Sequence, residues 1–435
     1  MIAGLAPTAT RFAAKGLGMG AQLVTLVLIT QALGADGFGR YALLLSIASI
    51  AAQLADFGTG RCQFRRAHRG SPVTMLAMGS LAFRLVTSLL LLPPLLFYAA
   101  HIGLPTGALA LGFAANLLFQ FANLNRHLLL LDGRVTAAIL VESAPALLFC
   151  VAIALCLTGG MPLGVTGALL LYLLATAASF AASMAASGTA AGWARAATLL
   201  LRTRWRRTLS GVAALARRAT PIGLDIFLAA ATLQAPILIA SVVGDGAAMP
   251  QVALVQRILG LEVAVLSVSI TARLKAYHDR GASGMLDLRP ALASAMLVFG
   301  CNMAGLFLLA PLATLVSADF TLVALALALQ PHLLLIAAVA GCTTAYLHGS
   351  MAALGGNWLW QRCLSGSIGL AVTIASAVLL SVNGAKPLSA VLLAALLGQG
   401  AAFGVLVAAV SRHGGRLRLP QLRMPLRSPA TGAGR

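Results

Sequence analysis

The 435-residue sequence predicts an all-α polytopic membrane protein, with about twelve transmembrane helices in two six-helix lobes around a central cavity. Its composition is the first reason, because 60% of the residues are hydrophobic and only 9% are charged. A soluble chain of this length needs more polar surface than that. The second reason is the recurrence of apolar runs near the roughly 20 residues that a helix needs to cross about 30 Å of hydrocarbon.

The first two apolar runs form a hairpin around the glycine-rich segment from Leu33 to Tyr41. The first run is too long for the apolar part of a signal peptide, so we expect it to remain as a helix. The third run contains Pro93 and Pro94 and is expected to tilt, kink or end early. The predicted spans are residues 12–33, 41–58, 73–100, 106–126, 136–157, 164–188, 221–243, 249–270, 290–315, 320–347, 363–382 and 388–411.

The positive charges predict the orientation of these spans. Of the 30 Lys and Arg residues, all except Arg40, Arg84, Arg257 and Lys386 lie at the N-terminus, in every second loop or in the tail. Short loops rich in Lys and Arg stay in the cytoplasm, so both termini are predicted to be cytoplasmic. The net charge of +20 then reflects orientation and attraction to anionic membrane lipids rather than binding to nucleic acid.

The chain divides into four predicted parts. Residues 1–190 form an N-terminal lobe and residues 221–411 a C-terminal lobe. Between them, residues 191–220 are a basic cytoplasmic linker, expected to be an amphipathic helix on the inner membrane surface with Trp193 and Trp205 as interfacial anchors. Residues 412–435 are a basic cytoplasmic tail, expected to be disordered near the headgroups.

An internal repeat with an offset of 210 residues supports the same division. It aligns Gly34 with Gly244, and two halves of like topology imply a central site between them. The offset also places Asp225 opposite Lys15. We therefore predict an inner gate that closes when Lys15 or Arg11 meets Asp225, while a helix-dipole role for Asp225 is the simpler alternative.

Two helices carry polar stripes with helical spacing, which predicts a lined cavity in the first half. Hydrogen bonds between helices are the alternative interpretation. The stripe on the first helix consists of Arg11, Lys15, Gly18, Gln22 and Thr25, and the stripe on the fourth consists of Asn116, Gln120, Asn123 and His127.

Ionisable residues within the spans need a partner or a water-filled cavity, because insertion at a helix centre costs roughly 2.5–3.5 kcal/mol. Arg84 and Glu142 are a candidate pair in the first half. Arg257 and Glu262 lie five residues apart, about 140° around a helix, so they are expected to pair with other helices. Structural ion pairs and a role in transport both remain open for these four residues.

Asp56 lies at the end of the second span, where the helix dipole disfavours an acid. We expect a nearby arginine of the following loop to clamp it. The candidates are Arg61, Arg65 and Arg66.

Catalytic and cofactor signatures are absent from the sequence. The six cysteines have no Cys-x-x-Cys spacing and no matched histidines, and no phosphate-binding lysine loop or nucleophile with a base is found. The sequence therefore predicts no enzyme, no cofactor and no metal site.

Three short motifs carry a resemblance to a known family. They are Leu33-Gly34-x-x-x-Phe38-Gly39-x-Tyr41, Asp56-x-Gly58 and Gln256-Arg257-Ile258. With the topology of the whole chain, they resemble the bacterial polysaccharide (O-antigen and exopolysaccharide) flippases of the multidrug/oligosaccharidyl-lipid/polysaccharide exporter superfamily. The resemblance implies an alternating-access transporter in the bacterial inner membrane that moves undecaprenyl-diphosphate-linked oligosaccharide to the outer leaflet.

The resemblance also implies roles for individual residues. The Gln256-Arg257-Ile258 motif supplies Arg257 as a contact for the diphosphate, and depth and facing add Arg11, Lys15 and Arg84. Gln22, Asn116, Gln120 and Asn123 are the neutral substrate-binding candidates, and Glu142, Asp225 and Glu262 are the candidates for coupling or gating. Export of a negative lipid is favoured by the membrane potential at about 2.3 kcal/mol per charge per 100 mV, and a proton or sodium ion is the alternative drive.

Three other functions remain open from the sequence. A cation-coupled drug antiporter of the same superfamily is expected to have an acidic cavity, whereas the stripes here are neutral or basic. A membrane polysaccharide polymerase or ligase usually needs a large external loop, and the external connections here are short. A non-transporting scaffold is the third alternative.

Overall fold

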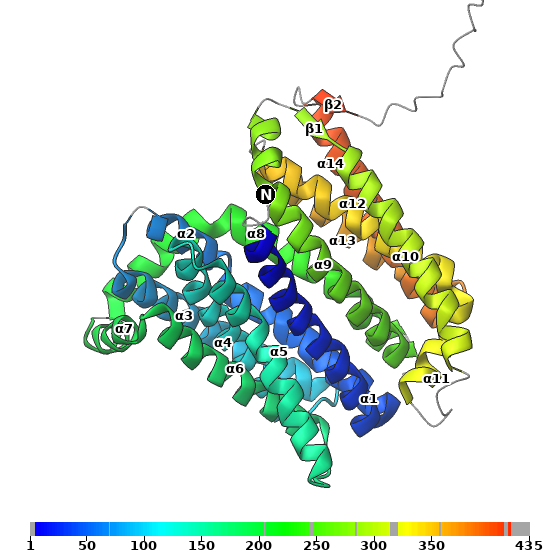
Figure 1. Ribbon diagram of the computed structural model, residues 1–435, viewed down its shortest axis with the longest axis horizontal. Coiled ribbons are helices and arrows are strands. Elements are labelled where there is room, and N and C mark those ends of the chain that lie inside the picture. Colours follow the sequence, from blue (N-terminus) through cyan, green and yellow to red (C-terminus); the bar gives the residue numbers. More distant parts are fainter. Residues whose placement is uncertain are drawn as a thin grey trace, which may run out of the picture.

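The computed structural model describes residues 5–68, 70–203, 205–243, 248–282, 285–313, 321–355, 358–412 and 416–418. These residues form a long helical protein in which one short pair of strands is described (Figure 1). In order, the elements are α1 (Leu5–Asp56), α2 (Thr59–His68), α3 (Val73–His101), α4 (Thr106–Leu131), α5 (Val135–Thr158), α6 (Val165–Ser187), α7 (Ala190–Arg202), α8 (Trp205–Val243), α9 (Ala248–Ala282), β1 (Met285–Asp287), α10 (Arg289–Ala313), α11 (Thr321–Ala328), the 3₁₀ turn η2 (Gln330–His332), α12 (Leu333–Gly355), α13 (Leu359–Val382), α14 (Pro387–Arg412) and β2 (Arg416–Arg418).

The predicted fold class is confirmed. Within the described part of the chain, 9 helical segments are long and apolar enough to cross a membrane. The first of these contains two spans because α1 bends at Gly34. α9 and α10 are the helices that cover the two other predicted spans, residues 249–270 and 290–315. Six spans come from α1 and α3–α6, and six from α8–α14, where α11, η2 and α12 together form one span.

The bend at Gly34 makes the hairpin. Gly34 has a φ of 69° and a ψ of 179°, a backbone conformation that is easy for glycine and strained for other residues. The residues that follow it return at once to helix, so the predicted turn from Leu33 to Tyr41 is wrong in extent. A single glycine is enough to reverse the chain here.

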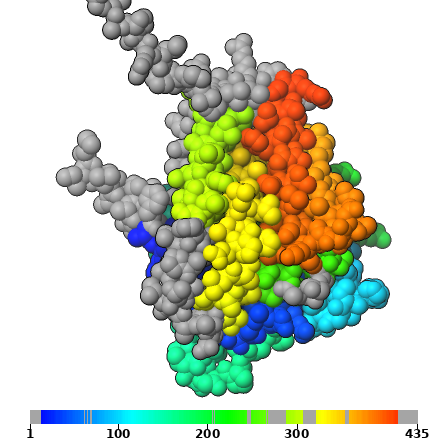
Figure 2. All heavy atoms as spheres, turned by 90° about the vertical axis from the view of Figure 1, so that its right-hand side faces the viewer, coloured from blue at the N-terminus to red at the C-terminus, as the bar shows by residue number. Residues whose placement is uncertain are grey.

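The two halves meet where α1 of the first half packs against α8 and α9 of the second (Figure 1). α1 packs on α4 and α5 in its own half and on α8, α9 and α11 in the other. One cluster of buried apolar residues runs without a break from Leu44 of α1 to Leu259 of α9 and Ile336 of α12. Most of the face seen in Figure 2 is formed by α10, α12, α13 and α14 of the second half, and segments of the first half, in blue, cyan and teal, lie along its lower edge.

Small side chains allow the helices to approach closely. The part of α1 after Gly34 buries Ala42, Ala48, Ala52 and Ala55. In lipid, helix association depends on close packing and hydrogen bonds rather than on a hydrophobic driving force between helices. This row of buried alanines therefore allows α1 to pack closely against helices of both halves.

The predicted linker, residues 191–220, contains α7 and the first part of α8 rather than a single surface helix. The predicted environment of its first anchor is wrong. Trp193 of α7 is buried between α4 and α6, and is not exposed at the membrane surface. The side chain of Trp205 lies outside the described residues. In the predicted disordered tail, Arg416–Arg418 instead form the strand β2, which pairs in parallel with β1.

The two halves also meet at a pair of glycines. A Cβ on Gly223 of α8 would lie 2.5 Å from the carbonyl oxygen of Phe57, and a Cβ on Gly58 would lie 2.7 Å from the nitrogen of Gly223. Both distances are shorter than atoms tolerate. Only glycine therefore allows the backbones to touch at this point.

We expect Gly223→Ala to lower the thermal stability of the purified protein, by about 1–3 kcal/mol of unfolding free energy, because the new methyl group meets backbone. The matched control is Gly211→Ala in the same helix, where a Cβ meets nothing within 4 Å. That change should stabilise the protein by about 0.5–1 kcal/mol, as alanine does inside helices. Equal effects of the two changes in detergent melting experiments contradict a close contact at Gly223.

Candidate functional site

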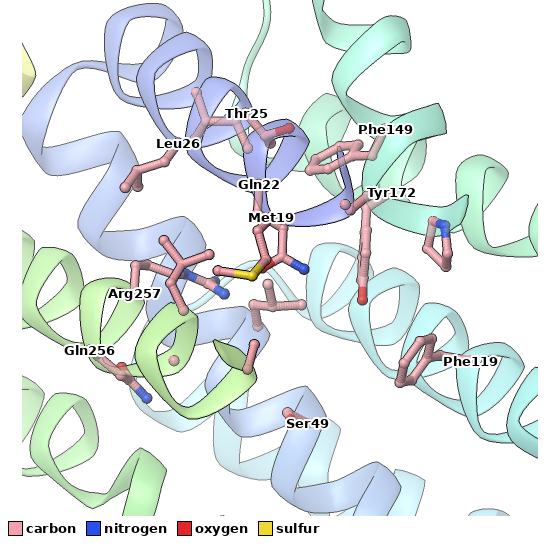
Figure 3. Close-up of a pocket in the computed structure, with 18 of the residues that line it drawn as sticks. Met19, Gln22, Thr25, Leu26, Ser49, Phe119, Phe149, Tyr172, Gln256 and Arg257 are labelled. Atoms are coloured by element: carbon pink, nitrogen blue, oxygen red, sulfur yellow. The ribbon is translucent and has the colours of Figure 1, made fainter. Parts of the chain in front are cut away.

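A cavity lies between the two halves, inside the predicted membrane region (Figure 3). Its volume is about 410 Å³, and α1, α4, α5 and α6 of the first half and α8 and α9 of the second half line it. This volume falls within the range of about 300–1,000 Å³ typical of ligand sites. In many transporter folds built from two repeated halves, the substrate site lies at the interface between the halves.

The polar stripe on the first helix faces this cavity. Lys15, Gly18, Gln22 and Thr25 all line it, on one side of α1. Steps of three and four residues place side chains on one helical face, which explains why the spacing is informative. Arg11 belongs to the same helix, but its side chain lies outside the described residues.

Arg257 is the cation that the second half contributes. It points from α9 into the cavity, toward the side lined by Met19 and Gln22 (Figure 3). Among the described residues, no carboxylate forms an ion pair with it, and Tyr41 and Tyr172 line the same space. A guanidinium held there has donors available for an anionic ligand.

On the opposite side, a carboxylate joins two cations. The Lys15 Nζ atom lies 2.8 Å from Glu142 Oε1, and the Arg126 Nη2 atom lies 2.8 Å from Glu142 Oε2. Glu142 is in α5, one residue before Ser143, whose side chain touches α1 at Gly18. The charged residues that line the described cavity are thus Lys15, Glu142 and Arg257, with one net positive charge, and Arg126 adds a further positive charge behind Glu142.

The remaining wall is aromatic and amide-rich. Phe119, Phe149 and Tyr172 supply rings, and Phe149 packs edge-on against Tyr172 with 5.3 Å between ring centroids. On the second half, Gln256 donates a hydrogen bond to Gln234, and both line the cavity. Such a surface suits a ligand with a charged group and neutral polar or apolar parts.

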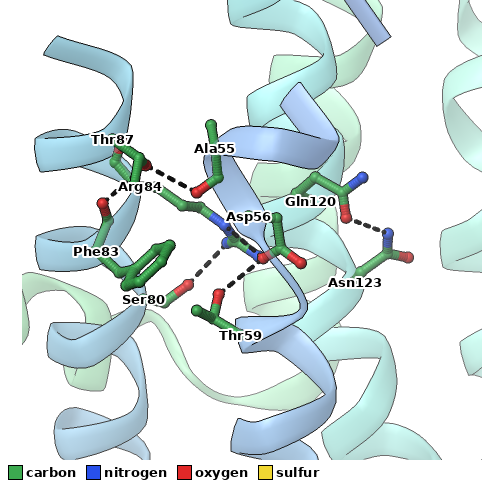
Figure 4. A network of polar contacts seen from close by, with 9 residues as sticks. All are labelled: Ala55, Asp56, Thr59, Ser80, Phe83, Arg84, Thr87, Gln120 and Asn123. Atoms are coloured by element: carbon green, nitrogen blue, oxygen red, sulfur yellow. Dashed lines mark hydrogen bonds and ion pairs between the residues drawn. The ribbon is translucent and has the colours of Figure 1, made fainter. Parts of the chain in front are cut away.

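Arg84 does not line the cavity, and its predicted pairing with Glu142 is wrong. Its Nε and Nη2 atoms lie 3.0 and 2.5 Å from Asp56 Oδ1, and its Nη1 atom donates to Ser80 at 2.7 Å (Figure 4). The guanidinium also lies 4.5 Å from the centre of the Phe121 ring, and the residue is only 2% exposed. In this position Arg84 is a structural group, out of reach of a ligand in the cavity.

The same contacts correct the prediction for Asp56. The predicted clamp from the next loop is wrong, because the cation comes from α3, 28 residues away. Thr59 adds a third hydrogen bond to the same oxygen at 2.9 Å. The acid at the unfavourable end of its helix is thus fully compensated by residues that sequence patterns do not place beside it.

The stripe on the fourth helix is only partly at the cavity. Asn116 lines it and donates a hydrogen bond to the Gly112 carbonyl at 2.8 Å. Gln120 is buried and accepts a hydrogen bond from Asn123 at 3.4 Å, on the side of α4 near the Arg84 cluster (Figure 4). Neither of these two residues is part of the described cavity wall.

Asp225 and Glu262, predicted to act in coupling or gating, also lie away from the cavity wall. Asp225 is buried in α8 and pairs with Arg362 of α13 at 3.0 Å. Lys15 is paired with Glu142, so the predicted contact between Lys15 and Asp225 is not formed in this structure. The alternative gate contact, between Arg11 and Asp225, lies outside the described residues. Glu262 of α9 lies near Asn302 of α10 and is not among the residues that line the cavity.

Sequence reasoning missed two cations as partners of acids inside the protein. Arg126 follows Asn123 by three residues, so it extends the polar stripe of α4 and its spacing is a usable signal. Arg362 precedes an apolar run, and charge alone predicts a cytoplasmic loop there. Nothing in the local sequence of Arg362 indicates that Asp225 is its partner.

Comparisons with known proteins show what the fold is similar to. No protein-family model matches the chain, and no curated protein matches it. Among solved structures, the lipid II flippase MurJ in an inward closed conformation has a TM-score of 0.66 at 12% identity, over 94% of this chain and 87% of that one. An inward-facing multidrug resistance MATE family transporter of the MOP superfamily has a TM-score of 0.62 at 16% identity, over 93% of this chain and 98% of that one.

The MATE multidrug transporter DinF-BH is equally similar, with a TM-score of 0.62 at 16% identity over 94% of this chain and 96% of that one. These matches cover nearly the whole length of both partners. The chain therefore has the fold of a multi-pass transporter of this kind. Both lipid-flipping and drug-exporting proteins share that fold.

Proposed function

We propose that this protein is an alternating-access flippase that moves a lipid-linked oligosaccharide, joined through an undecaprenyl diphosphate, from the inner to the outer leaflet of the bacterial inner membrane. The observation that carries the proposal is Arg257, a cavity cation without an acidic partner among the described residues. Placing a permanently charged group at that depth in the membrane costs free energy unless a counter-ion binds to it. A diphosphate is such a counter-ion.

The rest of the cavity favours the same class of ligand. Arginine binds phosphate oxygens through a forked pair of hydrogen bonds, and Lys15 adds a point charge on the facing helix. Amide side chains such as Gln22, Asn116 and Gln256 offer donors and acceptors that suit sugar hydroxyls. The polyprenyl chain is expected to stay in the surrounding lipid, since a cavity of about 410 Å³ is too small for the whole lipid-linked molecule.

A cation-coupled drug antiporter is the second candidate because MATE transporters have the same fold. A cationic drug, however, would meet a cavity with net positive charge, which repels it. The sign of the charge therefore favours the flippase. The proposed orientation keeps both termini in the cytoplasm, and the membrane potential then drives export of the negative headgroup.

Arg257→Ala should reduce translocation at least about tenfold, because a charge-assisted hydrogen bond contributes about 1.5–3 kcal/mol. The assay uses proteoliposomes that contain a fluorescent undecaprenyl-diphosphate oligosaccharide, with imposed potentials of both signs. Arg257→Lys should retain part of the activity, since it keeps the charge and loses the fork.

The control is Arg195→Ala, which removes an exposed arginine of α7 far from the cavity wall and should leave translocation unchanged. Translocation at the wild-type rate by well-folded Arg257→Ala protein contradicts the proposal. In that case, efflux of a cationic dye under a proton or sodium gradient decides for the antiporter, and failure of both assays favours a scaffold.

A further inference from the structure

We propose that Lys15, Arg126 and Glu142 form a masked phosphate site, in which the Glu142 carboxylate and the substrate's diphosphate compete for the same two cations. The inference rests on the proposed function and adds two residues to it. Arg126 becomes a direct ligand of the substrate, and Glu142 an internal competitor that sets affinity and aids release.

The geometry is that of one anion bridging two cations. Each oxygen of Glu142 takes one of them, Lys15 through Oε1 and Arg126 through Oε2, both at 2.8 Å. A phosphate group accepts the same charge-assisted hydrogen bonds from lysine and arginine. An anion that enters the cavity meets Lys15 first, and it reaches Arg126, which lies behind Glu142, by displacing that carboxylate.

Exposure separates this cluster from the other ion pairs. The side chains of Lys15, Glu142 and Arg126 are 15%, 25% and 29% exposed. The pair of Arg84 and Asp56 is 2% and 7% exposed, and that of Arg362 and Asp225 is 7% and 5%. Among the pairs described, only those at Glu142 are open enough for their partners to be exchanged.

The guanidinium of Arg126 is also incompletely used. Its Nη2 atom binds Glu142, while its Nε atom is buried with no hydrogen-bond partner among the described residues. Arg84 shows the alternative, because there Nε and Nη2 both reach Asp56. A phosphate with several free oxygens can satisfy both donors of Arg126, which Glu142 does not do here.

An anion that displaces Glu142 consequently binds the unused Nε donor of Arg126, and the carboxylate no longer competes with it for the two cations. A neutral or cationic ligand has neither advantage. The cluster thus selects for anions, and return of the carboxylate to its two cations favours release of the headgroup at the other side of the membrane.

The test measures binding of geranylgeranyl diphosphate to the full-length protein in detergent, with geranylgeraniol as the uncharged probe. Glu142→Gln should bind the diphosphate roughly tenfold more tightly, within the usual range of coupling between linked groups. Adding Arg126→Gln to Glu142→Gln should abolish this gain, and binding of the alcohol should not change. Asp132→Asn, in the exposed turn after α4, is the control and should bind as the wild type does.

Several outcomes overturn the inference. If the wild type binds and Arg257→Gln weakens binding, but Glu142→Gln gives no gain, then Glu142 is only a structural partner and the proposed function stands. If Glu142→Gln does not fold, Arg126→Gln alone decides, since wild-type affinity in that variant excludes Arg126 as a ligand. If neither the wild type nor any variant binds the diphosphate, the proposed function and the inference both fail.

Discussion

Asp56→Ala is expected to destabilise the protein by about 3–5 kcal/mol, because it leaves the Arg84 guanidinium buried without its counter-charge. Arg84 is 2% exposed, so water cannot replace the lost carboxylate. Ser80 and the Phe121 ring remain beside it but carry no negative charge. Reversible unfolding of the purified protein in mixed detergent and SDS measures the loss.

The double variant Asp56→Ala, Arg84→Met provides the decisive comparison. Removing both charges should cost clearly less than Asp56→Ala alone, because no buried charge is left unpaired. Asp132→Ala removes an exposed acid and should change the free energy of unfolding by no more than about 0.5 kcal/mol. If Asp56→Ala is as mild as Asp132→Ala, the pair does not hold α1 to α3.

The number and order of the spans could be predicted because hydrophobicity and length are local properties of the chain. The same holds for the polar face of the first helix, where steps of three and four residues place Lys15, Gln22 and Thr25 on the cavity. Helical periodicity gives the relative facing of residues on one helix. It does not give the rotation of that helix against its neighbours.

That missing rotation explains the errors in pairing. Similar depth in the membrane predicts a pair of Arg84 and Glu142. The rotation of α3 instead places Arg84 beside Asp56, and the rotation of α5 places Glu142 beside Lys15 and Arg126. Counting charge alone likewise places Arg362 in a loop. Which acid meets which cation depends on contacts between helices that are far apart in sequence.

The linker shows a second limit of sequence patterns. An amphipathic helix with a tryptophan on its apolar face fits a membrane surface and a protein surface equally well. In α7, the apolar face meets protein at Trp193. The indole Nε1 atom donates a hydrogen bond to Asn125 Oδ1 at 2.9 Å, and the ring packs edge-on against Phe121 and Phe180.

Trp193→Ala should therefore destabilise the protein by about 3–5 kcal/mol, the usual cost of removing a buried tryptophan. Part of this cost comes from the packing with the two phenylalanines, and part from the polar cluster, since Asn125 Oδ1 keeps only its bond from Thr189 at 3.0 Å. Trp193→Phe separates the two parts. It retains a ring and loses the hydrogen bond, so it should cost only about 0.5–1.5 kcal/mol for that bond.

The control is Trp360→Ala, since that side chain is 60% exposed at the start of α13. Removing a membrane-surface anchor lowers stability mainly in lipid, whereas removing a buried core residue lowers it in detergent as well. If Trp193 served the membrane surface, both alanine variants would unfold alike in detergent and differ from the wild type mainly in lipid. A large loss in detergent at Trp193 alone shows instead that protein contacts hold the linker helix to α3, α4 and α6. Movement of the first half then carries α7 with it.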